Sequence, residues 1–470
     1  MRDRTHSGGH KSLSRKARYV ILLFVTECLR GSAAGRRRFV SRVIRRIARL
    51  LGLYQASYLT FRLWEKVIGL IWTRAGSTGE PRCPQWLWAT AGLDNGPYLR
   101  SWIRRRYEGG PKIVVLGTGS IGDVLQITPL LRALREKFPV AGISLLHRSP
   151  AARTVLQGNR NVDSITIADS YHFEQVKKAV RDEGAADLVV EIEAISYIVS
   201  YTPAPLAVLH PDLRAIFSDS FFATAAAAQE LCKRYHPVFL RPKVKSVRLE
   251  QRKDFHYLEV LGATGNLSID RHSALDFFAE AGDAVTLDLF TLKKPYVTVQ
   301  NGVDSDVMKW SRAMGRRPTK LLPTTTWQKI VRLLHAGNLA VIQLGTADDE
   351  RIDGADIDLR GCTTLGQAAV ILKSAVCHVG VEGGLVHLAR AVHVRSVVAF
   401  GPTSAAFLGY PQNVNLVASD CNSCWWTTED WYMHCPRGLM GPPCMNAYTA
   451  DMIAGAALSI HKGDDAHCRG

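Results

Sequence analysis

Short apolar runs alternate with amphipathic stretches over most of the chain. Runs of five or six residues predict strands at 112–117, 143–147, 188–192, 296–300, 340–344, 377–381 and 396–400. Apolar residues spaced three and four apart predict helices at 124–138, 327–334, 365–374 and 385–392, and 206–290 reads as mostly helical with loops. Strands separated by helices favour parallel sheets with helices on both faces. The two series of strands predict an α/β protein of two doubly wound domains with a cleft between them.

The first part of the chain has a different pattern. From Phe39 to about Trp72, apolar residues recur three and four apart, and arginines interleave with them. This basic amphipathic pattern is typical of a helix on an anionic membrane surface or a partner, and equally of an ordinary helix whose arginines face water. Residues 73–110 are rich in Gly, Pro and Trp and predict an irregular connector. The expected divisions are a basic helical extension with connector at 1–110, an N-terminal Rossmann-like domain at 111–290 and a C-terminal one at 291–470.

The charge of the chain is concentrated in that first segment. Residues 1–110 hold 22 Lys and Arg against 6 Asp and Glu, a balance of +16, while the other 37 basic and 36 acidic residues balance to +1. The hydrophobic content of 47% is that of a soluble globular protein. No apolar run reaches the roughly 18 to 20 residues that cross a bilayer, and the basic start lacks a convincing signal cleavage site. We expect a cytoplasmic protein that is peripheral at the anionic inner face of the cytoplasmic membrane.

A glycine turn follows the first predicted strand of the first series. Residues 117–122 read G-T-G-S-I-G, the spacing of a dinucleotide-binding turn. Such a site needs an acid at the end of the second strand, but that strand runs into His147 and Arg148. Arg148 keeps an NADP interpretation open, because it could contact a 2′-phosphate. Asp123 opposes that interpretation, since its carboxylate at the helix start would repel a pyrophosphate.

Asp123 has two further interpretations. The helix dipole stabilises an anionic carboxylate at this position, and an acid at a strand–helix junction facing a cleft suits a general base. The alternative is a plain helix cap, a role that Asp performs often. If Asp123 is a base, the turn beside it is predicted to contact substrate through Gly119, Ser120 and Gly122.

A second strand–helix junction lies in the second series, in the segment C-H-V-G-V-E-G-G-L-V-H-L-A-R-A-V at 377–392. Gly383, Gly384 and the following Leu385 would present backbone N–H groups at a helix start, which is a ready anion site. Glu382 precedes these amides and could hold ribose hydroxyls. His387, in the first turn, could donate to a phosphate oxygen or act as a buried capping histidine.

One lysine completes the candidate diphosphate site. Lys320 lies in a Pro-rich loop just before the helix predicted from Trp327. A flexible ammonium at this place suits diphosphate neutralisation, although a lone loop lysine is more often solvated.

These residues carry a resemblance to a known family. The stretch I-G-D-V-L-Q-I-T-P-L-L-R-A-L-R (121–135) resembles the N-terminal signature of the family 9 glycosyltransferases, the bacterial heptosyltransferase family. The stretch V-G-V-E-G-G-L-V-H-L-A-R-A (379–391), followed by F-G-P-T (400–403), resembles its C-terminal signature. The resemblance covers roughly residues 111–460. It implies a GT-B fold, with the donor held mainly by the second domain, and sugar transfer from a nucleotide-diphosphate donor with inversion and no required metal.

The resemblance also assigns roles to individual residues. Asp123 falls on the proposed base of the family and Lys320 on its phosphate-binding lysine. The residues 382–384 replace the usual Asp-Thr-Gly with Glu-Gly-Gly, and His387 matches the family histidine. The replacement lengthens the acid and removes a hydroxyl, so the donor stays open between ADP-heptose and a similar nucleotide sugar.

Four cysteines near the C-terminus have metal-ligand spacing. They follow the pattern C-x2-C-x10-C-x8-C in a Pro- and Gly-rich loop, at Cys421, Cys424, Cys435 and Cys444. This spacing fits a tetrahedral four-thiolate site, with free thiols or local disulfides as the alternatives. The pattern resembles the iron-binding finger of the autotransporter heptosyltransferases in this family. It predicts structural iron or zinc, because thiolates suit both. Three tryptophans of the loop could cover the metal, stack on a sugar or simply pack: Trp425, Trp426 and Trp431.

The sequence therefore predicts an inverting glycosyltransferase that uses a nucleotide-diphosphate sugar such as ADP-heptose. The acceptor would be a hydroxyl of lipopolysaccharide core or another glycolipid, or a protein hydroxyl. A membrane or nucleic-acid adaptor on an inactive GT-B scaffold and an NADP-dependent oxidoreductase remain as alternatives. An oligomer is compatible with all of these interpretations.

Overall fold

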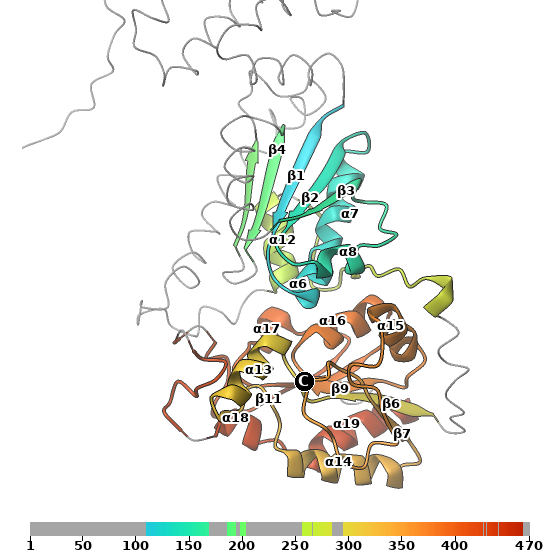
Figure 1. Ribbon diagram of the computed structural model, residues 1–470, viewed down its shortest axis with the longest axis vertical. Coiled ribbons are helices and arrows are strands. Elements are labelled where there is room, and N and C mark those ends of the chain that lie inside the picture. Colours follow the sequence, from blue (N-terminus) through green and yellow to red (C-terminus); the bar gives the residue numbers. More distant parts are fainter. Residues whose placement is uncertain are drawn as a thin grey trace, which may run out of the picture. The chain divides into compact units, whose positions relative to one another are not determined.

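A computed structural model of the chain describes residues 110–168, 186–193, 198–203, 256–265, 267–283, 295–425, 427–428, 430–439 and 441–463. The expected basic extension lies outside these residues except for Gly110, as does most of 206–290. Residues 101–470 form one compact unit, which contains two sheets (Figure 1). None of the helices in the described part of the chain is both long enough and apolar enough to cross a membrane.

The first sheet has the strand order β3-β2-β1-β4-β5. Its strands are β1 (Lys112–Gly117), β2 (Gly142–His147), β3 (Ser164–Ile167), β4 (Leu188–Glu193) and β5 (Ile198–Pro203). The first four run parallel, but β5 pairs antiparallel with β4, unlike the all-parallel expectation. Only four residues connect β4 to β5, and a connection this short allows a hairpin but not a parallel crossover.

The helices of this half are α6 (Ile121–Gln126), α7 (Thr128–Lys137), α8 (Ala151–Val155) and α12 (Tyr257–Gly265). The single helix predicted at 124–138 is divided at Ile127. Pro129 has no N–H with which to continue the helical bonding to the Leu125 carbonyl, and the Thr128 hydroxyl bonds that carbonyl instead, at 2.8 Å. The short helix α6 consequently ends just beyond the glycine turn that precedes it.

The second sheet is entirely parallel in its pairings, with the order β11-β10-β9-β6-β7-β8. Its strands are β6 (Tyr296–Gln300), β7 (Ala340–Gln343), β8 (Ile357–Asp358), β9 (His378–Val381), β10 (Ser396–Phe400) and β11 (Val414–Val417). The strands β8 and β11 were not expected. Because β8 has two residues and no residue of β11 is fully buried, neither carries a continuous apolar run. The segment 396–400 is therefore not the last strand of the series.

The helices of this half are α13 (Ser305–Ala313), α14 (Thr324–Ala336), α15 (Leu365–Lys373), α16 (Gly384–Ala391), α17 (Ala405–Leu408), α18 (Pro443–Asn446) and α19 (Ala450–Lys462). Side chains of Asp304, Thr364 and Thr449 cap the starts of α13, α15 and α19 by accepting backbone N–H bonds. No side chain caps α16, whose N-cap residue is Gly383. This uncapped start matters for the candidate site.

The core of the second sheet is built from its buried strands and the helices α14 and α19, which pack against each other (Figure 1). Trp327, Ile330 and Leu334 recur three and four apart on α14 and are fully buried. Shortening Trp327 to Ala would remove its packing and cost about 3–5 kcal/mol. The strands are mostly apolar because helices cover both faces of a parallel sheet.

Candidate active site

The two predicted strand–helix junctions meet in the structure. The first joins β1 to α6, the second joins β9 to α16, and the helices α6 and α16 are in contact. A Cβ atom placed on Gly122 would lie 2.7 Å from Cδ2 of His387, and one placed on Gly384 would lie 3.8 Å from the Gly122 nitrogen. Only glycine allows this close approach at Gly122.

Asp123 occupies the third position of α6, and its neighbour Ser120 is the N-cap. The Asp123 Oδ2 atom accepts the Ser120 backbone N–H at 2.8 Å and faces the Ser120 hydroxyl at 3.4 Å. Asp123 thus takes part in a capping box, although Ser120 and not Asp123 is the N-cap. Gly119 has φ +107°, and a Cβ there would lie 2.5 Å from the Asp123 carboxyl, so glycine is required for this turn.

The surroundings of Asp123 suit a base. Burial raises the pKa of its carboxyl and the nearby Glu382 carboxylate adds to this, while the Ser120 N–H and His387 oppose it. The net pKa is raised above its ordinary value of 3.8. A carboxylate with a raised pKa is a stronger proton acceptor, so capping and base roles are compatible in this residue.

Glu382 forms the centre of the second junction. Its side chain is 8% exposed, and its Oε2 accepts a hydrogen bond from Lys320 Nζ, which also bonds the Glu382 carbonyl at 3.3 Å. The other oxygen, Oε1, lies 3.6 Å from His387 Nε2. Burial alone would raise the pKa of Glu382, but Lys320 and His387 outweigh it and hold the pKa well below its ordinary value. Glu382 is therefore a permanent anion near neutral pH.

Lys320 is not the flexible, solvated ammonium that its loop suggested. Its side chain is 17% exposed, and Nζ lies 5.9 Å from the ring centroid of Trp431. The preceding Thr319 donates its N–H to the Tyr432 carbonyl at 2.9 Å and its hydroxyl to the Trp431 carbonyl at 2.8 Å. The four-cysteine loop therefore fixes the backbone next to Lys320.

The start of α16 is open to an anion. Gly383 has an extended backbone, with φ 174°, and a Cβ there would meet only the Val381 carbonyl oxygen, at 4.0 Å. No side chain caps this helix, so the N–H groups of its first residues, Gly384 and Leu385, receive no side-chain hydrogen bond at the N-cap. A diphosphate oxygen is the kind of ligand that such an end binds.

His387 is buried, as one of its two interpretations required, and it has a partner that sequence reasoning missed. Its Nδ1 atom lies 2.6 Å from the hydroxyl of Tyr410, a fully buried residue in the loop between α17 and β11. No periodicity or motif in the sequence marks Tyr410, because the contact depends on how this loop returns to α16. His387 joins Tyr410 on one side to Glu382 on the other.

The four predicted metal ligands gather in one region. Cys444 is 2% exposed, and the side chains of the other three are half-buried. Burial raises the pKa of the Cys444 thiol to about 12, and the charges of Cys421, Cys424 and Cys435 add to this rise. Even so, no group of three or more His, Cys, Asp or Glu side chains among the described residues is arranged to hold a metal ion. None of the four is in a disulfide.

The tryptophans of this loop pack in the protein. Trp425 is fully buried and meets Phe407 edge to face, with ring centroids 5.4 Å apart, and Trp431 is 8% exposed. Trp426 lies outside the described residues. Packing is therefore the role that Trp425 and Trp431 have here.

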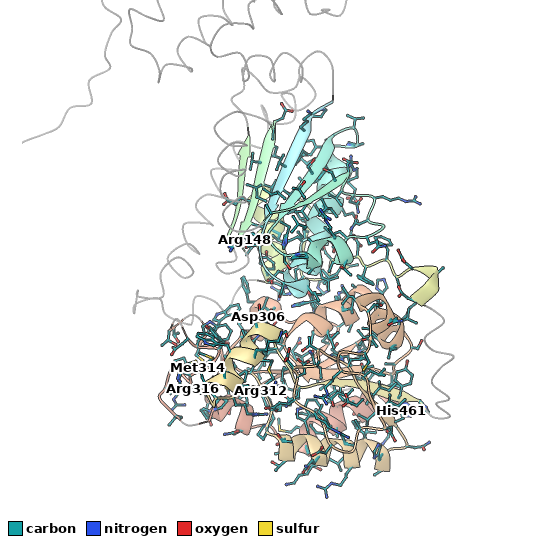
Figure 2. The ribbon with its side chains drawn as sticks, viewed as in Figure 1. Arg148, Asp306, Arg312, Met314, Arg316 and His461 are labelled. Carbon is teal, nitrogen blue, oxygen red and sulfur yellow. The ribbon has the colours of Figure 1, made fainter. Side chains whose placement is uncertain are left out.

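The end of β2 does not resemble a dinucleotide site. His147 is buried, and its Nδ1 accepts the Ser149 N–H at 2.9 Å. Its ring fills the space above Gly117, where a Cβ would lie 2.7 Å from His147 Cδ2. Arg148, the residue that kept the NADP interpretation open, is exposed just after β2 (Figure 2).

Comparisons with known proteins give a family and a fold. Residues 280–429 match Glycosyltransferase family 9 (heptosyltransferase). No curated protein matches the chain in sequence. The solved structure of the glycosyl transferase family 9 from Veillonella parvula DSM 2008 is 17% identical, with a TM-score of 0.51, over 75% of this chain and 98% of that one. This likeness shows the GT-B fold.

Two weaker structural similarities involve Escherichia coli proteins. ADP-heptose lps heptosyltransferase II is 15% identical with a TM-score of 0.45, over 76% of this chain and 100% of that one. The iron-containing dodecameric glycosyltransferase TibC from enterotoxigenic E. coli H10407 is 15% identical with a TM-score of 0.47, over 76% of this chain and 80% of that one. The family match over residues 280–429 favours sugar transfer over the oxidoreductase and adaptor alternatives, and with the GT-B fold it indicates a glycosyltransferase whose second half is similar to family 9, the heptosyltransferase family.

Proposed function

We propose that this protein transfers a heptose or a similar sugar, with inversion, from a nucleotide-diphosphate donor to an acceptor hydroxyl. The observation that carries this proposal is the meeting of two acid-bearing helix starts, α6 with Asp123 and α16 with Glu382. The pKa of Asp123 is raised and that of Glu382 is lowered. Environments that separate two carboxyl pKa values in this way commonly mark different chemical roles.

In the proposed reaction Asp123 is the general base. It takes the proton of the acceptor hydroxyl while that oxygen forms a bond to the anomeric carbon of the donor. The bond from the anomeric carbon to the diphosphate oxygen breaks on the opposite face, and the electron pair leaves with the diphosphate. One displacement of this kind inverts the anomeric centre and needs a single base.

The second junction is proposed to hold the leaving diphosphate. The open N–H groups of Gly384 and Leu385 face the charge that develops on the diphosphate, and Lys320 and His387 add two side-chain donors. An ammonium has three N–H donors, and Glu382 accepts two of those on Lys320, through Oε2 and the main-chain oxygen. The third is free in this arrangement to reach a phosphate oxygen, while Glu382 fixes the direction of the side chain.

A panel of nucleoside diphosphates and nucleotide sugars tests the donor class. A ligand that binds only the folded protein raises the melting temperature as its concentration rises. We expect ADP and ADP-heptose to stabilise the protein, and ADP-heptose to release ADP when a suitable acceptor is present. Stabilisation by NADP in place of every nucleoside diphosphate would contradict the proposal.

The four cysteines are proposed to hold structural iron or zinc. Their spacing in one loop and the influence of the other three on the Cys444 thiol support a four-thiolate site. The role is structural, because their loop fixes the backbone of Thr319 beside Lys320. Metal analysis should give about one ion per chain, with visible thiolate-to-iron absorption if it is iron.

A matched pair of variants tests this metal site. Cys424→Ser should lower the metal content and the melting temperature, whereas Cys362→Ser, at an exposed free thiol outside the loop, should change neither. Full metal content in Cys424→Ser protein would remove the assignment.

The acceptor is proposed to be a glycolipid or a protein at the inner face of the cytoplasmic membrane. The +16 balance of residues 1–110 supports attraction to anionic lipid, at about 1 kcal/mol per basic residue near the surface. The full chain should sediment with vesicles that contain anionic lipid and not with neutral ones, and added salt should release it. Equal binding to both kinds of vesicle would contradict this location.

A further inference from the structure

Tyr410 is the residue of the site that no motif explains. It is fully buried, and its hydroxyl lies 2.6 Å from Nδ1 of His387. Its ring is held from two other sides, by the Arg390 guanidinium at 5.7 Å from the ring centroid and by the His256 ring at 5.7 Å. The hydroxyl therefore has a fixed position next to the imidazole.

The hydrogen bond between the Tyr410 hydroxyl and His387 has one favourable direction, with the hydroxyl as the donor. Burial raises the pKa of Tyr410 above its ordinary value of 10, so the phenol stays protonated. The side chain of Gln126 lies beside the hydroxyl and opposes this shift, which is the effect of an amide N–H directed at the phenolic oxygen. Gln126 Nε2 is buried and has no hydrogen-bond partner within bonding distance among the described residues. A small adjustment of this amide would direct its N–H to the phenolic oxygen, which would leave the phenolic hydrogen for Nδ1 on the other side.

This direction determines where His387 carries its own proton. In a neutral imidazole one nitrogen accepts and the other donates. If Nδ1 accepts from Tyr410, the ring proton is on Nε2. That nitrogen lies 3.6 Å from Glu382 Oε1, on the side of the open α16 start.

We infer that Tyr410 is a positioning residue that keeps the proton of His387 on Nε2, so that the imidazole can donate to the departing diphosphate. The donation itself rests on the proposed function. Gln126 extends the chain of polar groups to α6, the helix that carries Asp123. Polar side chains thus lie side by side from Gln126 and Tyr410 through His387 and Glu382 to Lys320, between the helix of the base and the donor site.

The tautomer can be read without any substrate. In full-length protein labelled with ¹⁵N-histidine, the two ring nitrogens of each neutral imidazole have distinct shifts, and the His387 signals are those lost in His387→Gln protein. At a mildly alkaline pH of about 8.5 we expect the Nε2–H form alone in the wild type. Tyr410→Phe should show a mixture of both tautomers. A wild-type ring with its proton on Nδ1, a doubly protonated ring, or an unchanged ring in Tyr410→Phe would overturn the inference.

Turnover then tests whether the tautomer matters for transfer. Tyr410→Phe should lower kcat about tenfold, the effect of one lost hydrogen bond, while KM for the donor changes less than about twofold. The matched control is Tyr296→Phe, which also loses a buried hydroxyl bond, at 2.7 Å to the Ile371 carbonyl, and should keep kcat. Equal loss in both variants would make the role of Tyr410 structural.

Gln126→Met serves as a second variant, and it also covers the case in which Tyr410→Phe fails to fold. It should produce the same mixture of tautomers to a smaller extent, and it should add nothing to the loss already caused by Tyr410→Phe in the double variant. If the two losses in kcat add up in the double variant, Gln126 and Tyr410 act separately, which would overturn the inferred coupling between them. Because the tautomer measurement needs no donor, absence of any sugar transfer by the wild type would refute the proposed function and leave the positioning of His387 to be judged by its ¹⁵N shifts.

Discussion

The helices α6 and α16 both begin next to glycines and an acid, but their first turns are capped differently. The start of α6 is closed, because Ser120 and Asp123 form a capping box. No side chain closes the start of α16, and its acid, Glu382, precedes the glycines and pairs with Lys320. A capped helix start uses its N–H groups for folding, while an uncapped one leaves them for an anion.

The pKa values of the two acids, Asp123 and Glu382, are shifted in opposite directions. Asp123 meets only partial compensation for its burial, and its pKa is raised. Glu382 is buried with an ammonium beside it, and its pKa is lowered. One acid is therefore ready to gain a proton and the other to stay charged, so we assign the chemistry to the first junction and the binding to the second.

The largest effect is expected from Asp123→Asn. An amide cannot take the acceptor proton, so kcat should fall by about 10²–10⁴-fold. The Asn oxygen can still accept the Ser120 N–H, so the melting temperature should stay close to that of the wild type. The matched control is Asp304→Asn at the start of α13, where the same change keeps the cap and should leave kcat unchanged. Transfer at normal rates by a folded Asp123→Asn protein would remove the base assignment.

Lys320→Met should affect both stability and binding. It leaves the buried Glu382 carboxylate without its cation, which costs about 3–5 kcal/mol of unfolding free energy. Lys309→Met is the control, because Lys309 is exposed and its ion pair with Asp348 is screened by water, so this variant should lose little stability. Chemical denaturation of both variants measures the difference. Similar losses in the two would show that the Lys320–Glu382 pair is no stronger than a surface pair.

The stabilisation by Glu382 should depend on pH in a defined direction. Because its pKa is lower in the folded protein, its contribution is complete above the ordinary value of 4.5 and is lost as the pH falls through the folded pKa. Glu382→Gln should cost about 1.5–3 kcal/mol at neutral pH, and this difference from the wild type should shrink below pH 4.5. Urea denaturation over a pH series measures it, and a difference that grows on acidification would contradict the lowered pKa.

The smallest effects come from the glycines. Gly119→Ala forces a side chain into a positive φ against the Asp123 carboxyl and should cost about 1–3 kcal/mol. Gly383→Ala has an extended backbone and open space, so its stability should change by no more than about 0.5 kcal/mol. The second variant should nevertheless bind the nucleoside diphosphate more weakly, since the new methyl group lies at the open end of α16. Equal losses of stability in Gly119→Ala and Gly383→Ala would show that the two turns do not differ in their need for glycine.

Sequence patterns predicted the strands that helices cover on both faces, such as β1 and β9, because burial makes most of their residues apolar. They did not reveal β8, which is too short, or β11, which has no fully buried residue. The break at Ile127 was hidden because Thr128 and Pro129 fall inside an unbroken apolar period. The fold itself explains these omissions, since edges and helix breaks leave no periodic signal.

The sequence predicted the motifs of the candidate site but not the side-chain contacts that join them. Asp123 and Glu382 stand next to glycines in the sequence, which is a visible local signal. Tyr410 and Trp431 reach His387 and Lys320 from separate loops, and no local pattern encodes such contacts. Long-range contacts of this kind depend on the packing of the whole second sheet.

We assign proton transfer to the first junction and diphosphate binding to the second. Calorimetric titration of ADP into Asp123→Asn and Lys320→Met proteins tests this assignment directly. The account predicts that Asp123→Asn binds ADP within about twofold of the wild type, while Lys320→Met binds at least about tenfold more weakly, a difference of roughly 1.4 kcal/mol. Equal weakening in both variants, or wild-type affinity in Lys320→Met, would contradict it.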